Sequence, residues 1–242
     1  MASLFISDLH LQPENPSVTA AFRRFLDETA SQAEALYILG DLFDDWVGDD
    51  DDNPFYLAVL DDLRRLHDRG VALFFLHGNR DFLIGAGFAS TTGATLLPDP
   101  VRIELHGHAL LLAHGDGFCT QDQEYMAFRQ LLRDPQWQRQ ALEKPLAERR
   151  AIAAQLHQIS QERNQQKASE IMDVSPDEVV RVMEENRASL LIHGHTHRPD
   201  IHPLRLAHGD AVRLVLGDWA RSGWFARLDE SGYWLIDFPI TA

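Results

Sequence analysis

Residues 3–10 read Ser-Leu-Phe-Ile-Ser-Asp-Leu-His, an apolar run that ends in two side chains able to bind a metal ion. Four further apolar runs end in the same way. They cover residues 36–39, 71–76, 109–113 and 189–192, and they precede Asp41, Asn79, His114, His195 and His197. Short runs of Leu, Ile, Val and Phe bounded by Gly or Asp are typical of buried strands in a largely parallel sheet.

The ends of these strands predict one shared site. In open α/β sheets, active sites form in the crevice beyond the carboxyl ends of the strands. Five such ends would bring together the candidate ligands Asp8, His10, Asp41, Asn79, His114, His195 and His197. Side chains alternate along an extended chain, so we expect each of the pairs 8/10 and 195/197 to present both members on one side.

The chemistry of these ligands indicates a site for two metal ions. Asp41 can bridge two ions with its carboxylate oxygens, and the other six ligands leave both coordination shells open for water and substrate. Two ions about 3.5–4 Å apart activate water and stabilise an in-line displacement at phosphorus. Imidazole, carboxylate and amide ligands without thiolate favour first-row divalent ions. The oxygen content favours Mn²⁺, with Fe²⁺, Co²⁺ and Zn²⁺ as alternatives.

Composition narrows the class of protein. The chain has 242 residues and is 45% hydrophobic, which suits an α/β domain with a sizeable core. Its net charge of −15 argues against nucleic-acid binding. No apolar stretch has the length of a membrane span, and the N-terminus starts with a strand instead of a targeting segment. The single cysteine, Cys119, excludes an internal disulfide, and we expect a cytoplasmic protein.

The segments between the strands predict helices. We expect helices over residues 17–33, over 54–69 behind the cap residue Asn53, and over 179–186 behind a capping box at 175–178. The buried stripe of the second helix is expected to be Leu57, Leu60, Leu63 and Leu66. Residues 212–216, 224–228 and 233–238 predict antiparallel strands of a second sheet.

Residues 122–169 contain only helix formers, so we expect a helical cap inserted into a single domain that spans residues 1–242. Between positions 125 and 170 the chain carries eight Lys and Arg residues against five Asp and Glu residues. This basic excess indicates either a solvated helical face with paired charges or a patch for an anionic substrate or lipid surface.

Several other polar residues have simpler explanations than metal binding. Asp218 follows a strand without a companion ligand and is expected to be structural. His77 and His193 precede glycines and are expected to orient loops or pack. The acidic run 49–52 is expected to be a loop or a helix N-terminus. The remaining histidines without a ligand context are His67, His106, His108, His157, His202 and His208.

The ordered motifs resemble those of the calcineurin-like metallophosphoesterase superfamily. They are Asp-Leu-His (8–10), Gly-Asp (40–41), Gly-Asn-Arg-Asp (78–81), His-Gly-Asp (114–116) and Gly-His-Thr-His (194–197). The resemblance implies two packed mixed β-sheets flanked by helices. It also implies that one metal is held by Asp8, His10, Asp41 and His197. The other is then held by Asp41, Asn79, His114 and His195.

Arg80 departs from the pattern of many superfamily members, which carry His at this position. A guanidinium cannot act as a general acid, but it can bind phosphoryl oxygens and offset charge in the transition state. An enzyme without this acid suits a leaving group that needs no proton, such as a phosphate. Arg80 therefore favours cleavage of a diphosphate over hydrolysis of an alkyl phosphomonoester.

Two longer stretches, 40–50 and 160–174, resemble the UDP-2,3-diacylglucosamine hydrolase family of lipid A biosynthesis. This resemblance implies attack of metal-activated water at the α-phosphorus of UDP-2,3-diacylglucosamine, which gives UMP and 2,3-diacylglucosamine 1-phosphate. It also implies peripheral contact with the cytoplasmic face of the inner membrane. The implied catalytic residues are Asn79, Arg80, His114 and His195. The implied substrate contacts are Asn79, Arg80, Asp122, Ser160, Asn164, Lys167 and His195.

Two other functions stay open at this point. One is a metallophosphoesterase that acts on another phosphodiester or diphosphate, against which Arg80 and the helical insertion argue. The other is a scaffold that keeps the fold without catalysis, against which the complete set of seven ligands argues.

Overall fold

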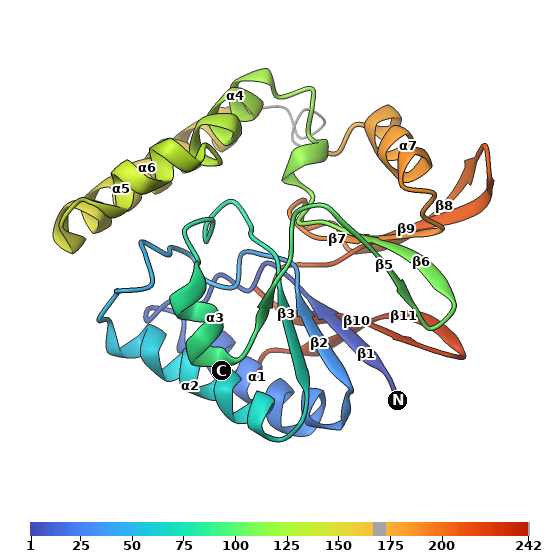
Figure 1. The fold of residues 1–242 in the computed structure, drawn as a ribbon, viewed down its shortest axis with the longest axis horizontal. Coiled ribbons are helices and arrows are strands. Elements are labelled where there is room, and N and C mark those ends of the chain that lie inside the picture. Colours follow the sequence, from blue (N-terminus) through green and yellow to red (C-terminus); the bar gives the residue numbers. More distant parts are fainter. Residues whose placement is uncertain (167–172, 242) are drawn as a thin grey trace.

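Two β-sheets pack face to face at the centre of the molecule, and helices cover their outer faces (Figure 1). The computed structural model describes residues 1–166 and 173–241, and all side chains among them except those of 158–166. None of the described helices is both long and apolar enough to cross a bilayer.

The first sheet has six strands in the order β11-β10-β1-β2-β3-β4. They are β1 (Ser3–Ile6), β2 (Ala35–Ile38), β3 (Ala72–Phe75), β4 (Thr95–Leu96), β10 (Ser222–Asp229) and β11 (Gly232–Pro239). The second sheet has five strands in the order β5-β6-β7-β9-β8. They are β5 (Val101–Leu105), β6 (His108–Leu112), β7 (Leu190–His193), β8 (Asp200–Leu206) and β9 (Gly209–Val215).

All five strands predicted from the apolar runs are present, but they belong to two sheets. Strands β1, β2 and β3 run parallel in the first sheet, and β6 and β7 run parallel in the second. The prediction that the three C-terminal strands form a second sheet was wrong. Strands β10 and β11 pair antiparallel in the first sheet because β10 adds to the free edge of β1, whereas β9 joins β7 as a parallel neighbour.

Side chains that alternate along the strands fill three layers of core. One face of β1 packs Leu4 and Ile6 against the helices α1 (Pro16–Glu28) and α2 (Pro54–Asp68), while Phe5 points into the space between the sheets. The outer face of the second sheet packs against α7 (Pro176–Glu185). Cys119 is buried in this third layer.

The predicted helices are present, with three corrections. The first ends at Glu28 and continues as a 3₁₀ turn over Ala30–Gln32. In α2, the Asn53 side chain caps the helix as expected, but Leu57 is 50% exposed. A stripe with a step of three residues turns by about 60° per step around a helix of 3.6 residues per turn, so it cannot stay on one face. At α7, the Ser175 side chain makes no capping hydrogen bond.

The cap consists of three helices that lie apart from the sandwich, above its upper edge in Figure 1. They are α4 (Gln123–Leu132), α5 (Pro135–Leu142) and α6 (Leu146–Gln166). A short helix on the core, α3 (Ala86–Thr92), and a 3₁₀ turn over Asp116–Phe118 complete the described helices. The cap therefore follows β6 directly and ends shortly before α7.

Candidate active site

The loops that follow β1, β2, β3, β6 and β7 bring all seven predicted ligands to one place. Asp8 lies with His10 and His197 in one group of potential metal ligands, and with Asp41 and His114 in a second. The two groups therefore share the Asp8 side chain.

Single contacts extend this cluster to the remaining ligands. His114 Nε2 lies 3.0 Å from Asn79 Oδ1, and its ring centroid lies 5.1 Å from that of His195. His10 Nε2 and His114 Nε2 approach the same Asp41 oxygen, at 3.9 and 3.7 Å. This position of Asp41 between the two histidines suits a carboxylate that bridges two ions.

The backbone at the ligands is left-handed, which corrects the expectation of an extended chain. Positive φ angles occur at Asp8 (56°), His10 (48°), Asp41 (51°), His195 (67°) and His197 (54°). This conformation disfavours residues with a Cβ atom and commonly marks functional sites. The backbone turns sharply after β1, β2 and β7, and these turns direct the predicted ligands toward one another. The prediction that both members of the pairs 8/10 and 195/197 face the site assumed an extended backbone, whereas all four residues have a left-handed backbone.

Two glycines allow the loops after β2 and β3 to touch. Gly40 has a φ of +86°, and a Cβ atom there would overlap the backbone of Gly78. A Cβ atom at Gly78 would in turn overlap the Asp41 carboxylate. Because neither position tolerates a side chain, the Gly-Asp and Gly-Asn motifs place Asp41 beside Asn79.

Asp81 joins the same two loops, a role that the sequence analysis missed. This buried carboxylate accepts the backbone N–H groups of Leu42 and Gly78, both at 2.8 Å. Ser7 has a comparable effect on Asp8, because its hydroxyl donates to Asp8 Oδ2 at 2.5 Å. The backbone N–H of His195 donates to the same oxygen at 2.8 Å. Asp8 Oδ1 is thereby left for other partners.

The charges of the site depend strongly on burial. Burial raises the pKa of Asp41 to about 7. Burial also opposes the charged form of His114, but the carboxylates of Asp41 and Asp8 raise its pKa to about 9. The pKa of His10 falls to about 3 through burial, and burial together with the His114 charge lowers that of His195 to about 4.

The residues present fit bound metal cations. Asp8 Oδ1 and His10 Nδ1 are buried and make no hydrogen bond to the described residues, although buried polar atoms normally do. Their neighbours are His197 Nε2, 3.4 Å from Asp8 Oδ1, and Asp44 Oδ1, 3.5 Å from His10 Nδ1. His114 Nδ1 donates to the Leu39 carbonyl at 2.9 Å, so in the neutral ring the lone pair of Nε2 faces the cluster. An outer partner of this kind orients histidines that bind metals.

Arg80 contributes both its backbone and its side chain. Its backbone N–H donates to Asp41 Oδ1 at 2.8 Å, and its guanidinium donates to His157 Nδ1 at 3.0 Å. Asp44 lies beside this pair, 3.4 Å from His157 Nδ1 and 3.5 Å from His10 Nδ1. His157 comes from the cap helix α6, far along the chain from Arg80.

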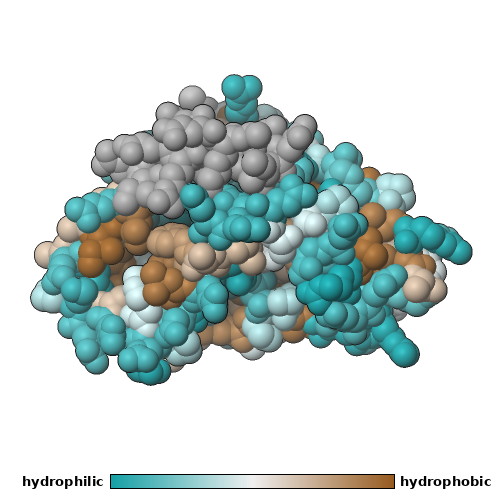
Figure 2. Space-filling view, turned by 90° about the horizontal axis from the view of Figure 1, so that it is seen from above, coloured by the Kyte–Doolittle hydropathy of each residue, from teal (hydrophilic) through white to brown (hydrophobic). Residues whose placement is uncertain are grey.

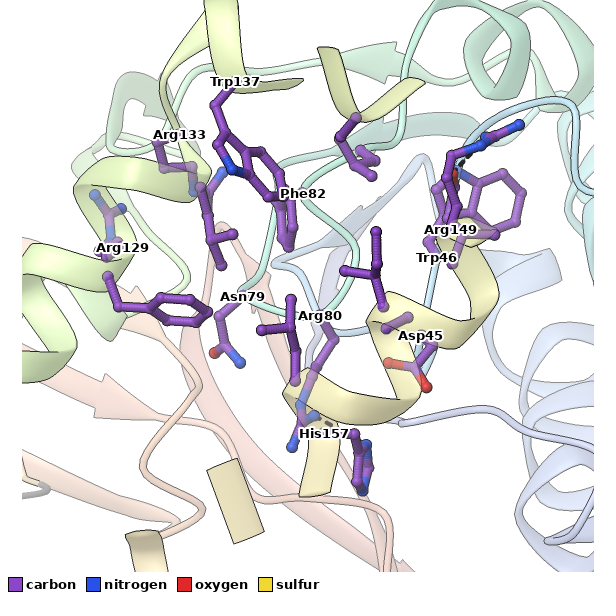
Figure 3. A pocket seen from close by; sticks show the side chains of 18 of the residues that line it. Asp45, Trp46, Asn79, Arg80, Phe82, Arg129, Arg133, Trp137, Arg149 and His157 are labelled. Atoms are coloured by element: carbon purple, nitrogen blue, oxygen red, sulfur yellow. Dashed lines mark hydrogen bonds between the residues drawn. The ribbon is translucent and has the colours of Figure 1, made fainter. Parts of the chain in front are cut away.

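A cavity of about 460 Å³ adjoins the ligand cluster beneath the cap. Figure 3 shows Asn79, Arg80 and His157 at one side of it and Phe82 and Trp137 at another. Its apolar lining is Trp46, Val47, Phe82, Leu83, Phe128, Leu132, Trp137, Ala141, Ile152, Ala153 and Leu156. The polar ligand cluster thus borders a largely apolar chamber.

Comparison with known proteins places this geometry in a family. The pattern of the Calcineurin-like phosphoesterase family matches residues 1–199. The UDP-2,3-diacylglucosamine hydrolase of Cellvibrio japonicus is 54% identical over 240 residues, which cover 99% of this chain and 100% of that protein. The enzyme of the same name from Pseudomonas aeruginosa is 49% identical over 242 residues, with 99% and 100% covered. This chain belongs to the UDP-2,3-diacylglucosamine hydrolase family.

Membership in the UDP-2,3-diacylglucosamine hydrolase family confirms the resemblance drawn from the motifs, and with it the fold of two packed mixed sheets. A metallophosphoesterase family implies divalent metal ions, and the two groups around Asp8 supply candidate ligands for them.

The predicted substrate contacts differ in their position: some lie at the cavity or the ligand cluster, one is buried in a helix cap, and the side chains of the others fall outside the described residues. Asn79 and Arg80 line the cavity, and His195 lies beside His114. Asp122 is buried at the start of α4, where its side chain accepts the Tyr125 N–H at 3.0 Å. The side chains of Ser160 and Asn164, and all of Lys167, lie outside the described residues.

Two residues regarded as bystanders lie at the site. His157 contacts Arg80, and Asp218 Oδ2 lies 3.9 Å from His197 Nδ1. Neither has a motif that could have revealed its position, since only the tertiary structure brings it there. The expectation that His77 and His193 orient loops or pack agrees with the structure. His77 donates to the Ile84 carbonyl, and His193 donates to the Gly194 carbonyl.

Four basic residues of the cap, Arg129, Arg133, Arg149 and Arg150, pair with carboxylates of the core, as expected for a face with paired charges. Three of them, Arg129, Arg133 and Arg149, also line the cavity. Arg149 donates to Asp50 at 2.7 Å and to the Val47 carbonyl at 2.6 Å, and Arg150 pairs with Asp51 and Asp52. Asp50, Asp51 and Asp52 of the acidic loop therefore pair with cap arginines, whereas Asp49 accepts the backbone N–H groups of Gly85 and Gly87 in the core.

Proposed function

We propose that this protein hydrolyses the diphosphate bond of UDP-2,3-diacylglucosamine, giving UMP and 2,3-diacylglucosamine 1-phosphate. The observation that carries the proposal is the apolar cavity that borders the polar ligand cluster. A substrate with acyl chains and a diphosphate needs these two environments side by side. The names of the relatives, which are about half identical over nearly the whole chain, support the same substrate.

Two divalent cations, with Mn²⁺ as the favoured ion, complete the proposed site. One is held by Asp8, His10, Asp41 and His197, and the other by Asp41, Asn79, His114 and His195. When bound, such ions supply an activated water and positive charge at phosphorus. The donor set and the buried Asp8 Oδ1 support this assignment.

Arg80 stabilises the phosphoryl oxygens in this proposal. Its guanidinium reaches the cavity side of the ligand cluster. A bidentate guanidinium binds two oxygens of one phosphate and offsets the charge that develops during displacement. Asn79, His114 and His195 are the other proposed catalytic residues, and each lies in the same cluster.

The acyl chains occupy the cavity between the cap and the core. Its apolar side chains come from all three cap helices and from core loops, so the cap acts as one wall of the lipid site. Asp122, Ser160, Asn164 and Lys167 are the further substrate contacts that we propose on the cap. We treat residues 1–242 as one domain with the cap inserted at about 122–169.

We further propose that the protein works at the cytoplasmic face of the inner membrane, where a substrate with two acyl chains resides. Leu131 and Leu142 on the cap helices are 49% and 42% exposed, which supports peripheral contact with lipid. Seen from above, hydrophobic residues form patches among hydrophilic ones on the face that includes the cap (Figure 2).

An assay with two substrates tests the proposal. Purified protein with Mn²⁺ should release UMP from UDP-2,3-diacylglucosamine in detergent micelles, and a chelator should stop the release. Bis(p-nitrophenyl) phosphate, which has no acyl chain, should be hydrolysed far more slowly. Equal rates on both compounds, or UMP release that persists in excess chelator, would overturn the proposal.

A further inference from the structure

One face of the cap helix α4 is directed at the loops that carry metal ligands. Tyr125, Arg129 and Arg133 are spaced by four residues, so they occupy successive turns on the same face. Their polar side-chain atoms form hydrogen bonds with Asp116 and with the Gly78 carbonyl, which belong to loops of the core. Figure 3 shows Arg129 and Arg133 extending from α4 near Asn79.

Arg129 and Tyr125 bind the carboxylates on either side of His114. Arg129 donates to Asp116 at 2.8 Å and to Asp99 at 2.9 Å, and Tyr125 donates to Asp116 at 2.9 Å. Asp99 in turn accepts the backbone N–H of His114 at 3.0 Å. Through Asp99, Arg129 of the cap helix holds the backbone of a proposed metal ligand.

Arg133 acts on the neighbouring loop. Its Nη2 atom donates to the carbonyls of His77 and Gly78, at 3.1 and 2.9 Å, directly before Asn79. Asn79 and His114 are 3.0 Å apart through their side chains and belong to the same proposed ion. Two arginines of one helix therefore restrain two ligands of one metal position.

We infer that α4 is a positioning element for the metal ion held by Asn79 and His114, so that loading of this ion depends on how the cap is docked. Outer partners of metal ligands commonly change metal affinity by about 10–100-fold when they are removed. The inference rests on the proposed dinuclear site. It adds that the cap, besides forming a wall of the lipid cavity, completes one of the two metal positions.

The other end of the cap provides a matched control. Arg149 also crosses from the cap to the core, but its partners are Asp50 and the Val47 carbonyl. These partners are at least six residues from Asp41, the nearest proposed ligand in the chain. Loss of Arg149 should disturb the cavity without disturbing a metal position.

The experiment compares Mn²⁺ binding to Arg129→Met, Arg133→Met and Arg149→Met by equilibrium dialysis and calorimetry. We expect the first two variants to bind one ion with wild-type affinity and the second at least about 10-fold more weakly. Arg149→Met should bind both ions as the wild type does and should raise only KM. Electron paramagnetic resonance should show the signal of a coupled Mn²⁺ pair in wild type and Arg149→Met at concentrations where the other two lack it.

Lysine variants separate positioning from general loss of charge. The ammonium of Arg133→Lys can donate to two carbonyls and should restore most of the second-ion affinity. Arg129→Lys should not, because one ammonium cannot reproduce the fork that joins Asp116 and Asp99. If Arg129→Met fails to fold, the Arg133 pair still decides the question.

Two results would overturn the inference. One is wild-type affinity for both ions in Arg133→Met, and the other is an equal loss of the second ion in Arg149→Met. A wild-type protein that binds fewer than two ions would instead refute the dinuclear site, and the coupling with it. Failure of the proposed function is thus distinguishable from failure of this inference.

Discussion

At the scale of single residues, Arg80 joins the proposed metal-ligand cluster to the cavity beneath the cap. Its backbone N–H is bound to the Asp41 carboxylate, while its guanidinium lies among the residues that line the cavity. A substitution of the side chain leaves the backbone contact in place, so the two contributions can be measured separately.

We expect Arg80→Lys to reduce turnover although it keeps the positive charge. An ammonium cannot reproduce the two parallel donors of a guanidinium. If Arg80 acts in the transition state, kcat and kcat/KM should fall together by about 10²-fold or more. Steady-state kinetics with UDP-2,3-diacylglucosamine measure this, and the Mn²⁺ content of the variant serves as the control. A higher KM with unchanged kcat would show that Arg80 binds only the ground state.

Asp41→Asn should abolish turnover without unfolding the protein. The carboxylate lies between His10 and His114, and an amide lacks the charge that two ions would share. We expect the far-ultraviolet circular dichroism to match that of the wild type and the Mn²⁺ content to fall below two per chain. A fully active variant with two bound ions would refute the bridging role.

At the scale of elements, sequence patterns predicted which segments form strands and helices but not which strands become neighbours. The apolar runs before Asp8, Asp41 and His114 identified their strands because burial on both faces leaves an unmistakable pattern. The same pattern contains no information about sheet membership, so β10 and β11 were assigned to the wrong sheet.

The cap helix α6 offers a direct test of the lipid cavity. Ala153 lines the cavity, whereas its neighbour Ala154 is exposed on the same helix. We expect Ala153→Trp to fill part of the space and to raise KM for substrates with long acyl chains, while Ala154→Trp should behave like the wild type. Kinetics over a series of acyl lengths measure the effect. An equal response to both substitutions would argue against acyl chains in this cavity.

At the scale of the whole molecule, the seven ligands could be found from sequence because each follows a recognisable strand. The roles of Asp81, Asp116 and His157 could not be predicted, because their partners come from other loops and from the cap. The two interpretations of the basic cap could not be separated from sequence for the same reason: charge counts do not show which carboxylates pair with Arg149 and Arg150.

The presence of Arg80 in place of a general acid predicts which phosphorus is attacked. When water attacks the α-phosphorus next to uridine, the sugar 1-phosphate departs as a leaving group that needs no proton. Hydrolysis in ¹⁸O-labelled water should therefore place the label in UMP and leave 2,3-diacylglucosamine 1-phosphate unlabelled. Mass spectrometry of the products measures this, and label in the lipid product would mean attack at the β-phosphorus.

The left-handed backbone at five of the proposed ligands predicts that these positions cost the fold stability. Alanine is usually the more favourable residue, but at His10, with a φ of 48°, glycine should be the better replacement. In chelator, His10→Gly should resist urea better than His10→Ala by roughly 1 kcal/mol. A higher free energy of unfolding for His10→Ala than for His10→Gly would show that the left-handed backbone does not destabilise the fold. If the prediction holds, selection of variants for stability alone would favour glycine at these five proposed metal ligands.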